Sequence, residues 1–377
     1  MSIRRHVFII GSKGIPACYG GFETFVDNLT ANRRREDIQY HVACLGSKNE
    51  EFSHNSAHCF RIRVPAFLGS AKAVFYDILA VRKVIGMVKR ENIQNAVLYV
   101  LASRIGLFLC LYKRKLQKYG IKLFVNPDGF EFRRERYNAL VRFYWKISEK
   151  YSVKSADLVI CDSRHIQEHI QEHYSKFNPQ MRFIAYGASL EKSKVSDSDE
   201  KLRDWYAKNG TSPGFYYLVV GRFVLENNFE TIIREFIKSG TGRKLIIIYN
   251  AERRVLNDRV IFAGALYDSE LLKKIRENAF AYIHGHEVGG TNPSLLEAMA
   301  STRLNLLLDV CFNREVAEGA ALYWSKENGS LAGLIDEADG MRGEDIEDFG
   351  RRARSRVLSD YSWDKVVGEY EELFGGR

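Results

Sequence analysis

The sequence predicts an α/β protein with two doubly wound, Rossmann-like domains. With 377 residues the chain is longer than a single hydrophobic core usually supports. Short β-branched runs alternate with amphipathic helical stretches, a pattern typical of parallel sheets covered by helices. A polar stretch after residue 187 interrupts this alternation, which then begins again. We therefore expect one domain over residues 1–187, completed by a closing helix at 361–377, and a second domain over residues 188–360.

The charged residues are unevenly divided between the two halves. Residues 1–190 contain 30 Lys and Arg against 16 Asp and Glu, whereas residues 191–377 contain 26 against 31. This asymmetry supports two domains and suggests that the first one meets an anionic partner, such as a membrane surface, a nucleic acid or a phosphorylated substrate. No nucleic-acid recognition module is found in the sequence, so we do not expect a nucleic acid.

Cysteine usage and the N-terminus favour a cytoplasmic location. The cysteines are scattered without a C-x-x-C pair, which argues against a disulfide framework or a zinc ribbon. The chain passes from basic residues straight into a short strand, so no signal peptide is expected. The most apolar segment, residues 97–112, contains Arg104 and is too short to span a bilayer.

The first domain begins with a buried strand and a long glycine-rich loop. The strand is VFIIG at residues 7–11, and the loop GSKGIPACYGG leads to a helix that begins near Phe22. The loop lacks the G-x-G-x-x-G spacing of dinucleotide-binding proteins, so a nicotinamide cofactor is not expected. Gly20 and Gly21 stand at the helix entry, where glycine lets the backbone approach a ligand closely.

A charged loop follows one of the later strands of this domain. Strands are expected at residues 40–45, 60–64, 96–100, 122–126, 158–161 and 183–185, and helices near 71–89, 103–118 and 137–154. The segment NPDGFEFRRERY comes directly after the 122–126 strand, and doubly wound domains bind ligands at the carboxyl ends of their strands. Asp128, Glu131, Arg133 and Arg134 are therefore candidate ligand-binding residues. A solvated loop is the alternative interpretation.

The helix after residue 163 carries the segment HIQEHIQEH. His165, His169 and His173 repeat every four residues and match the H-x-x-E-H pattern of some zinc peptidases. A zinc enzyme also needs a further ligand and an open coordination position. Because Ile166 and Ile170 form an apolar face, we favour an ordinary crossover helix with a solvated stripe of His and Glu.

The second domain repeats the alternation and ends in a distinctive turn. Strands are expected at residues 216–220, 244–249, 260–262, 281–284 and 305–308, with helices after the GRFVLENN turn and at 271–279. The stretch HGHEVGGTNPSLLEAMA, residues 284–300, joins a strand, a glycine turn and a helix that begins at Pro293. First-turn amides lack internal partners and the helix dipole favours negative charge, so this stretch predicts a phosphate-binding cradle.

These motifs, in this order, resemble family 4 retaining glycosyltransferases of the GT-B architecture. They are the double glycine at residues 20–21, the GR…EN turn at 221–227, the glycine turn that ends in LLEAMA and the closing YSWDKVVGEYEEL. The longer segments GSKGIPACYGGFETFV and NPDGFEFRR are similar to bacterial β-1,4-L-rhamnosyltransferases of capsular or rhamnan polysaccharide synthesis. The resemblance implies two Rossmann-like domains that face a central cleft, with a C-terminal helix that crosses back to the first domain.

The resemblance also implies roles for individual residues. Gly20 and Gly21 would lie near the donor diphosphate or the transferred sugar, and Arg222 would bind the diphosphate. Glu297 would bind the ribose hydroxyls. The remaining donor-binding residues would offer backbone amides or side chains to phosphate and sugar; they are Asn227, Gly289, Gly290, Thr291 and Asn292.

Two positions depart from the family pattern. Asn227 stands where the family usually has a lysine, so one positive charge on the leaving diphosphate is missing. Gly289 stands where the first glutamate of the family's E-x7-E falls, and that glutamate normally contacts the hexose. Its loss fits a different sugar, such as a 6-deoxy-L-hexose. Glu287 or His286 is a candidate substitute for it.

The implied reaction is transfer of L-rhamnose, with retention, from dTDP-β-L-rhamnose to a sugar on a polyprenyl diphosphate. No metal or other cofactor is expected, and Asp128 is the candidate that binds or deprotonates the acceptor hydroxyl. Glu131, Arg133 and Arg134 would help to bind the acceptor. Alternatives are a transferase that uses a UDP-hexose, a sugar-nucleotide epimerase, a zinc hydrolase and a non-catalytic nucleotide-binding protein.

The resemblance and the basic first half together predict peripheral contact with the anionic inner face of a bacterial membrane. Basic residues on or beside helices with apolar faces would make this contact, although a solvated charged face is the alternative. They are Lys72, Arg82, Lys83, Lys89, Arg90, Arg104, Lys113, Arg114 and Lys115.

Overall fold

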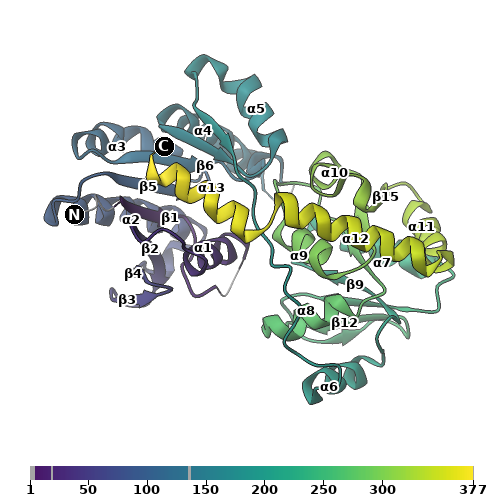
Figure 1. Ribbon diagram of the computed structural model, residues 1–377. Coiled ribbons are helices and arrows are strands. Elements are labelled where there is room, and N and C mark those ends of the chain that lie inside the picture. Colours follow the sequence, from purple (N-terminus) through teal and green to yellow (C-terminus); the bar gives the residue numbers. More distant parts are fainter. Residues whose placement is uncertain (1–4, 18–19, 135–136, 377) are drawn as a thin grey trace. The chain divides into compact units, whose positions relative to one another are not determined.

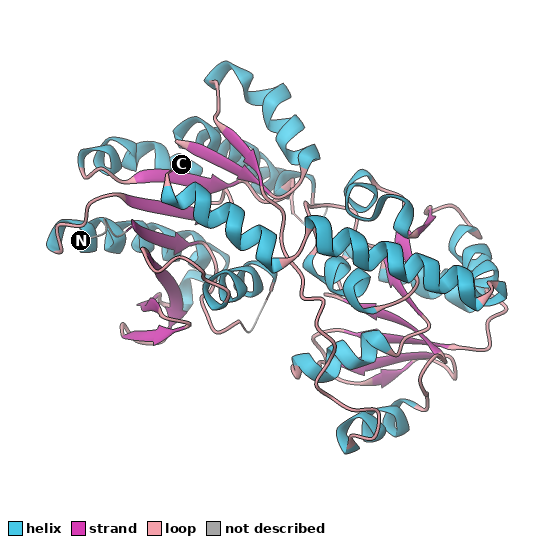
Figure 2. Ribbon diagram, in the orientation of Figure 1, coloured by secondary structure: helices cyan, strands magenta, loops and turns pink. Residues whose placement is uncertain are grey.

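The computed structural model describes residues 5–17, 20–134 and 137–376 and divides into two compact units (Figure 1). Unit 1 comprises Met1–Tyr186 and Trp363–Arg377, and unit 2 comprises Gly187–Ser362. Each unit has one mainly parallel sheet with helices on both faces (Figure 2). The prediction of two Rossmann-like α/β domains is therefore confirmed.

Unit 1 contains an eight-stranded sheet in the order β3-β4-β2-β1-β5-β6-β7-β8. All neighbouring strands are parallel except β3, which pairs antiparallel with β4. The chain winds outward from β1 in one direction, through β2 and β4, and then returns to continue from β5 in the other. The strands are β1 Arg5–Ile10, β2 Ile38–Gly46, β3 Glu51–His54, β4 Ala57–Arg63, β5 Ala96–Leu101, β6 Lys122–Asn126, β7 Leu158–Cys161 and β8 Met181–Phe183.

Alternate residues of β5 pack against different helices in unit 1. Leu98 and Val100 face a core that includes buried residues of α2 and α3. Tyr99 points to the other face, where its hydroxyl is 3.0 Å from that of Tyr370 on α13. The helices are α1 Gly21–Ala31, η1 Ala66–Ala71, α2 Lys72–Arg90, α3 Gly106–Lys118, η2 Glu131–Arg133, α4 Ala139–Ser155, α5 Arg164–Tyr174, η3 Ser175–Phe177 and α13 Trp363–Gly375.

Unit 2 contains a seven-stranded sheet in the order β11-β12-β10-β9-β13-β14-β15. The winding direction reverses between β9 and β13, which are parallel neighbours. Only β11 is antiparallel, to β12, among the described strand pairs of this sheet. The strands are β9 Tyr216–Val220, β10 Lys244–Ile248, β11 Arg254–Val255, β12 Val260–Gly264, β13 Ala281–His284, β14 Asn305–Leu308 and β15 Leu322–Trp324.

Two buried clusters lie on opposite faces of this second sheet. Tyr217 and Val219 of β9 pack with α7 and α11, while Tyr216 and Leu218 pack with α6, α8 and α9. The helices are α6 Glu200–Asn209, η4 Leu225–Asn227, α7 Phe229–Lys238, α8 Ser269–Glu277, α9 Pro293–Ser301, α10 Cys311–Ala317, η5 Glu318–Ala320, α11 Ser330–Gly340 and α12 Gly343–Asp360.

The short edge strands β3, β11 and β15 are missing from the sequence prediction. They lie at the ends of the two sheets. With two to four residues each, they carry too little hydrophobic periodicity to be recognised.

Candidate functional site

The reversal between β9 and β13 places two loops side by side in unit 2. Ligands of doubly wound sheets bind at this point, outside the carboxyl ends of the strands. One loop, residues 221–228, follows β9, and the other, residues 285–292, follows β13. The expected donor-binding residues on these loops are therefore brought together, although they are 57 or more residues apart in sequence.

Backbone and side-chain contacts join the two loops. Asn228 Nδ2 donates to Gly285 O at 2.8 Å, and Glu287 N donates to Glu226 O at 3.0 Å. A Cβ atom at Gly285 would lie 2.5 Å from Asn227 O, so only glycine permits this approach. The two loops thus form one preorganised surface.

The cradle expected at α9 is built differently from the prediction. Asn292 caps the helix: its Oδ1 accepts from Ser294 N at 2.9 Å, and its backbone oxygen accepts from Leu295 N at 3.1 Å and Leu296 N at 3.2 Å. Pro293 has no amide hydrogen. The first-turn amides are therefore already used, and the expectation that they bind an anion was wrong.

The glycine turn before the helix offers amides instead. Within the described part of the chain, the amides of Gly289, Gly290 and Asn292 form no hydrogen bond. Thr291 is buried beside them. His284 closes the base of the turn, and burial lowers its pKa to about 3, so this imidazole is neutral. An anion at the turn would meet the unused amides, and the neutral His284 would add no positive charge to them.

Arg222 is the cation that accompanies these amides. Its side chain is exposed and forms no ion pair or hydrogen bond with any residue that the structure describes. Asn227, in contrast, is engaged: its Nδ2 donates to Arg222 O at 2.7 Å, and its Oδ1 lies 2.7 Å from His286 Nδ1. Arg222 is thus available for a phosphate, and Asn227 holds the two loops together.

Glu297 is anchored by an arginine that sequence reasoning missed. Arg276, a buried residue of α8, places its NH2 group 2.7 Å from one carboxylate oxygen of Glu297 and 3.2 Å from Ser294 Oγ. About a third of the Glu297 side chain stays exposed, at 38%. The carboxylate is oriented by this pair and keeps one face toward solvent. The only signal for Arg276 was its place beside Ile275 on the buried side of a helix.

The corresponding reversal in unit 1 lies between β1 and β5. A Cβ atom at Gly11, where φ is +97°, would lie 2.1 Å from Leu101 O at the end of β5. Arg104 NH2 donates to Gly11 O at 2.7 Å and its Nε is 3.3 Å from the buried Asp77 carboxylate. Burial raises the pKa of Asp77 to about 6, an effect that Arg104 opposes.

Arg104 was expected on a membrane-facing surface, and this expectation was wrong. Only 20% of its side chain is exposed, because the guanidinium lies beneath the loop that follows β1 at Gly11. It therefore supports the carboxyl edge of the sheet.

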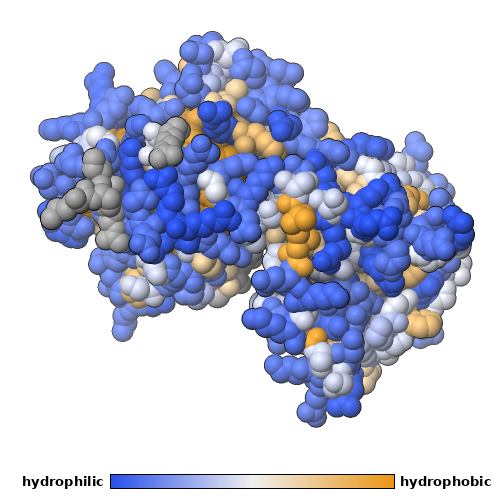
Figure 3. Space-filling model, in the orientation of Figure 1, coloured by the Kyte–Doolittle hydropathy of each residue, from blue (hydrophilic) through white to orange (hydrophobic). Residues whose placement is uncertain are grey.

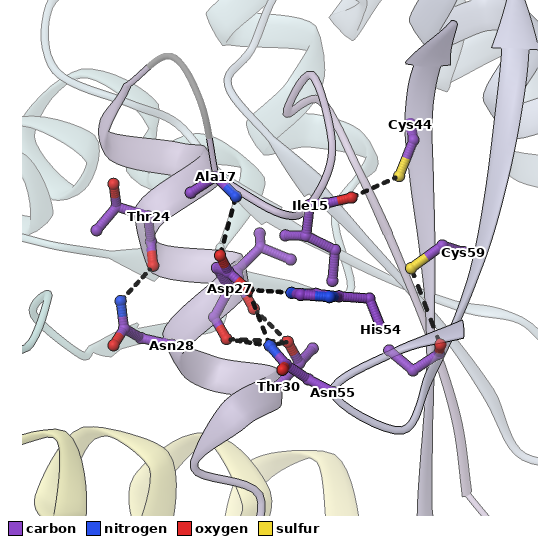
Figure 4. Close-up of polar contacts among 12 residues, drawn as sticks. Ile15, Ala17, Thr24, Asp27, Asn28, Thr30, Cys44, His54, Asn55 and Cys59 are labelled. Carbon is purple, nitrogen blue, oxygen red and sulfur yellow. Dashed lines mark hydrogen bonds and ion pairs between the residues drawn. The ribbon is translucent and has the colours of Figure 1, made fainter. Parts of the chain in front are cut away.

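Two carboxylates of α1 hold the glycine-rich loop, and Figure 4 shows one of them, that of Asp27. Glu23 accepts from Lys13 N at 2.6 Å, and Asp27 accepts from Ala17 N at 2.9 Å. The stick view shows that Asp27 also meets His54, with His54 Nε2 at 2.9 Å. The loop is thus fastened to α1, and Asp27 in turn joins α1 to the end of β3.

Gly20 and Gly21 end this loop at the start of α1. Both are exposed, and no side chain caps the helix. Their expected proximity to the donor stays a prediction.

Asp128 stands at the end of β6 with φ at +63°. Its amide donates to Asn126 Oδ1 at 2.7 Å, and its Oδ1 accepts from Gly129 N at 2.9 Å. These bonds hold the half-buried Asp128 in a backbone conformation that is uncommon overall. Such conformations are concentrated at functional sites. Its suggested role stays a prediction.

The three residues expected to bind an acceptor are placed differently from one another. Glu131 and Arg134 are buried and form an ion pair with each other. Arg133 is exposed, with its guanidinium 4.2 Å from the centre of the Phe130 ring. Of the three, only Arg133 is positioned to meet a ligand directly, and the other two brace the loop.

His169 of α5 supports this loop. His169 is buried, with Nε2 3.1 Å from Glu149 Oε1, and it packs against Phe130 and Phe132. The expected solvated stripe was wrong at this position. Among the described residues no group of three or more His, Cys, Asp or Glu side chains is placed to hold a metal ion. The zinc-hydrolase alternative is not supported.

Comparisons with known proteins find one family model and several solved structures. A family described only as a domain of unknown function (DUF1972) matches residues 4–189. A search of curated proteins finds no match.

Solved structures resemble the whole chain at low sequence identity. Sucrose-phosphate synthase from Thermosynechococcus elongatus is 16% identical, with a TM-score of 0.76, and the alignment covers 99% of this chain and 100% of that one. A trehalose-6-phosphate structure from E. coli bound with UDP-2-fluoro glucose is 10% identical, with a TM-score of 0.74 and 99% of both chains covered. HepE from Anabaena in complex with UDP is 12% identical, with a TM-score of 0.70 and coverage of 99% and 100%. These likenesses show that the fold is GT-B.

Proposed function

We propose that this protein is a glycosyltransferase whose unit 2 binds a nucleotide-sugar donor at the β9–β13 loops. One observation carries the proposal: exposed Arg222, the unused amides of the glycine turn and the oriented Glu297 all lie at the carboxyl ends of these strands. An arginine and backbone amides suit a diphosphate, and a carboxylate suits ribose hydroxyls. Two structures of the same fold have UDP or a UDP-sugar bound, which supports a ligand of this class.

The proposed donor is dTDP-β-L-rhamnose, and the proposed reaction retains the configuration at the anomeric carbon. The resemblance of the longer motifs to rhamnosyltransferases supports this sugar, as does Gly289 in place of a hexose-binding glutamate. Arg222 and the turn amides would stabilise the charge that develops on the leaving diphosphate. No metal takes part in the proposed mechanism.

The proposed acceptor is a sugar hydroxyl bound by unit 1. Asp128 would bind this hydroxyl or remove its proton, because Gly129 N engages only one of its carboxylate oxygens. Arg133 would contact the acceptor, while Glu131, Arg134 and His169 hold the loop. If the leaving phosphate takes the proton on the same face, Asp128 keeps a positioning role.

A lipid-linked acceptor and a peripheral membrane location complete the proposal. No helix among the described residues is long and apolar enough to cross a membrane. Large apolar side chains are nevertheless exposed at the start of α4: Leu140 at 80% and Phe143 at 63%. Arg142 lies between these two residues in sequence and Lys146 follows them, and both basic residues are exposed. Such a surface suits the anionic inner face of a bacterial membrane and a polyprenyl-diphosphate sugar.

A transferase that uses a UDP-hexose is the second candidate, favoured by UDP in the structures of similar fold. A thermal-shift screen of dTDP, UDP and their sugar conjugates separates the two, since a ligand at 100 times its Kd stabilises the folded state by about 2.7 kcal/mol. We expect dTDP-L-rhamnose to raise the melting temperature most. Preferential stabilisation by a UDP-hexose would favour the second candidate, and no effect of any nucleotide would contradict both.

A further inference from the structure

Two exposed arginines of unit 1 meet at Phe132. The guanidinium carbon of Arg133 lies 4.2 Å from the centre of the Phe130 ring and 5.8 Å from that of the Phe132 ring. Arg142, near the start of α4, donates from Nε to Phe132 O at 2.8 Å. The start of α4 is thus joined to the loop that carries Asp128, and two positive charges are held beside the same residue.

No carboxylate that the structure describes neutralises these two charges. Arg133 has only its two ring contacts and Arg142 only its bond to Phe132 O among the described residues. Glu131, a carboxylate of the same loop, is buried in its ion pair with Arg134. Neighbouring like charges repel each other, and a bound anion relieves that repulsion. Because guanidinium groups match phosphate oxygens in geometry, this arginine pair favours a phosphate or diphosphate.

The same end of α4 also exposes large apolar side chains. Leu140 and Phe143 are largely exposed, and Arg142 stands between them in sequence. Residues three positions apart lie on the same side of a helix, so Leu140 and Phe143 form one apolar strip beside a cation. An anionic head group on an apolar chain suits such a surface. Two guanidinium groups match the two phosphoryl groups of a diphosphate better than the single phosphate of a membrane phospholipid.

We propose that Arg133 and Arg142 together bind the diphosphate of a lipid acceptor, whose apolar chain rests on Leu140 and Phe143. This inference rests on the proposed function and deepens it, because it names the residues that hold the part of the acceptor that does not react. A head group bound there lies on the loop that carries Asp128. That order is the one required if the sugar attached to the diphosphate is to meet this carboxylate.

Calorimetric titration with two soluble ligands separates the head group from the chain. Inorganic pyrophosphate and geranyl diphosphate are titrated, without vesicles, into the full-length protein. The donor turn is saturated with the nucleotide that the thermal-shift screen selects, so that neither ligand is measured there. We expect geranyl diphosphate to bind at least about tenfold more tightly than pyrophosphate, because several methylene groups are buried in addition to the charge contacts.

Variants of the four side chains assign each contact. Arg133→Gln and Arg142→Gln should each weaken the binding of both ligands by about tenfold or more, since each removes charge-assisted hydrogen bonds. Arg142→Lys keeps the charge without the planar fork and should recover part of this loss. The double variant Leu140→Ser and Phe143→Ser should weaken geranyl diphosphate by about tenfold and leave pyrophosphate within about twofold.

Arg114→Gln on α3 is the matched control. Arg114 is exposed and forms no ion pair with a described residue, and the exposed Leu111 stands three residues before it. This pair repeats the chemistry of Arg142 and Leu140 without a bond to the acceptor loop. Both affinities should stay within about twofold of the wild type in this variant.

Binding of neither ligand by the wild type would overturn the inference, as would equal weakening by Arg114→Gln and Arg142→Gln. Unchanged affinities in Arg133→Gln and Arg142→Gln would also overturn it. Binding seen only with phosphatidylglycerol vesicles would assign the arginines to the membrane surface and so contradict the proposed diphosphate site. If the wild type bound geranyl diphosphate but no nucleotide or sugar nucleotide, the proposed function would fail while this site would stand.

Discussion

At the scale of single residues, the chemistry of the donor loops depends on which polar groups are already used. No residue that the structure describes binds the Arg222 side chain or the amides of Gly289 and Gly290, whereas the Asn292 side chain caps a helix. Glu297 is oriented by Arg276, a partner from another helix. The resemblance to glycosyltransferases pointed to Arg222 and Glu297, but it did not show that Asn227 and Asn292 serve the protein's own backbone.

Replacement of Asp128 by asparagine tests the acceptor chemistry at this scale. We expect kcat to fall by a factor of about 10² to 10⁴, the usual contribution of a general base, while donor affinity stays within about twofold. Turnover of dTDP-L-rhamnose and calorimetric donor binding measure the two effects. Asp364→Asn is the matched control, since that carboxylate is 85% exposed in a surface ion pair. Unchanged turnover in Asp128→Asn would remove Asp128 from the mechanism.

At the scale of elements, the strand–turn–helix units around both strand-order reversals could be recognised from local pattern. The apolar run at 279–283, the glycine turn and Pro293 indicated β13 and α9 close to their observed limits. The edge strands could not be recognised, because they are too short for a periodic signal. The use of the α9 amides by Asn292 was also missed, since a cap and a ligand site share the same residue types.

A glycine in the β1 loop provides a test of how closely these elements pack. Gly11→Ala should lower the free energy of unfolding by about 3–5 kcal/mol, because the new Cβ meets Leu101 O and φ is +97°. Gly86→Ala is the control: it lies in α2 with open space around it and should raise stability by about 0.5–1 kcal/mol. Chemical denaturation measures both. Similar stabilities of the two variants would contradict the close approach of β1 and β5.

At the scale of the whole molecule, some basic side chains of the first half are paired or buried and others are exposed. Lys83 and Lys113 form ion pairs with Glu51 and Asp157, and Arg104 is largely buried. The face seen in Figure 3 is mostly hydrophilic, with small apolar patches. Exposed apolar and basic residues coincide at the start of α4, so the proposed membrane contact lies there rather than along every basic helix.

Vesicle flotation tests this contact with the full-length protein. We expect binding to vesicles that contain phosphatidylglycerol, weaker binding at high salt, and little binding to neutral phosphatidylcholine vesicles. The double variant Leu140→Ser and Phe143→Ser should lose at least about tenfold in binding, by the loss of apolar burial. Leu358→Ser in unit 2 removes a side chain as exposed as Phe143, at 63%, and should have no effect. Equal binding to both kinds of vesicle, or none, would contradict the proposal.

The α/β class, the two Rossmann-like domains, the loop that carries Arg222 and the helix that carries Glu297 follow from local patterns. Hydrophobic periodicity and turn residues act over a few neighbouring positions. The pairing of those loops is decided by strand order, which brings together segments far apart in the chain. Only that packing reveals Arg276 behind Glu297 and Arg104 beneath Gly11. Each of these contacts depends on which strand ends are neighbours, and a linear pattern of residue types does not contain that information.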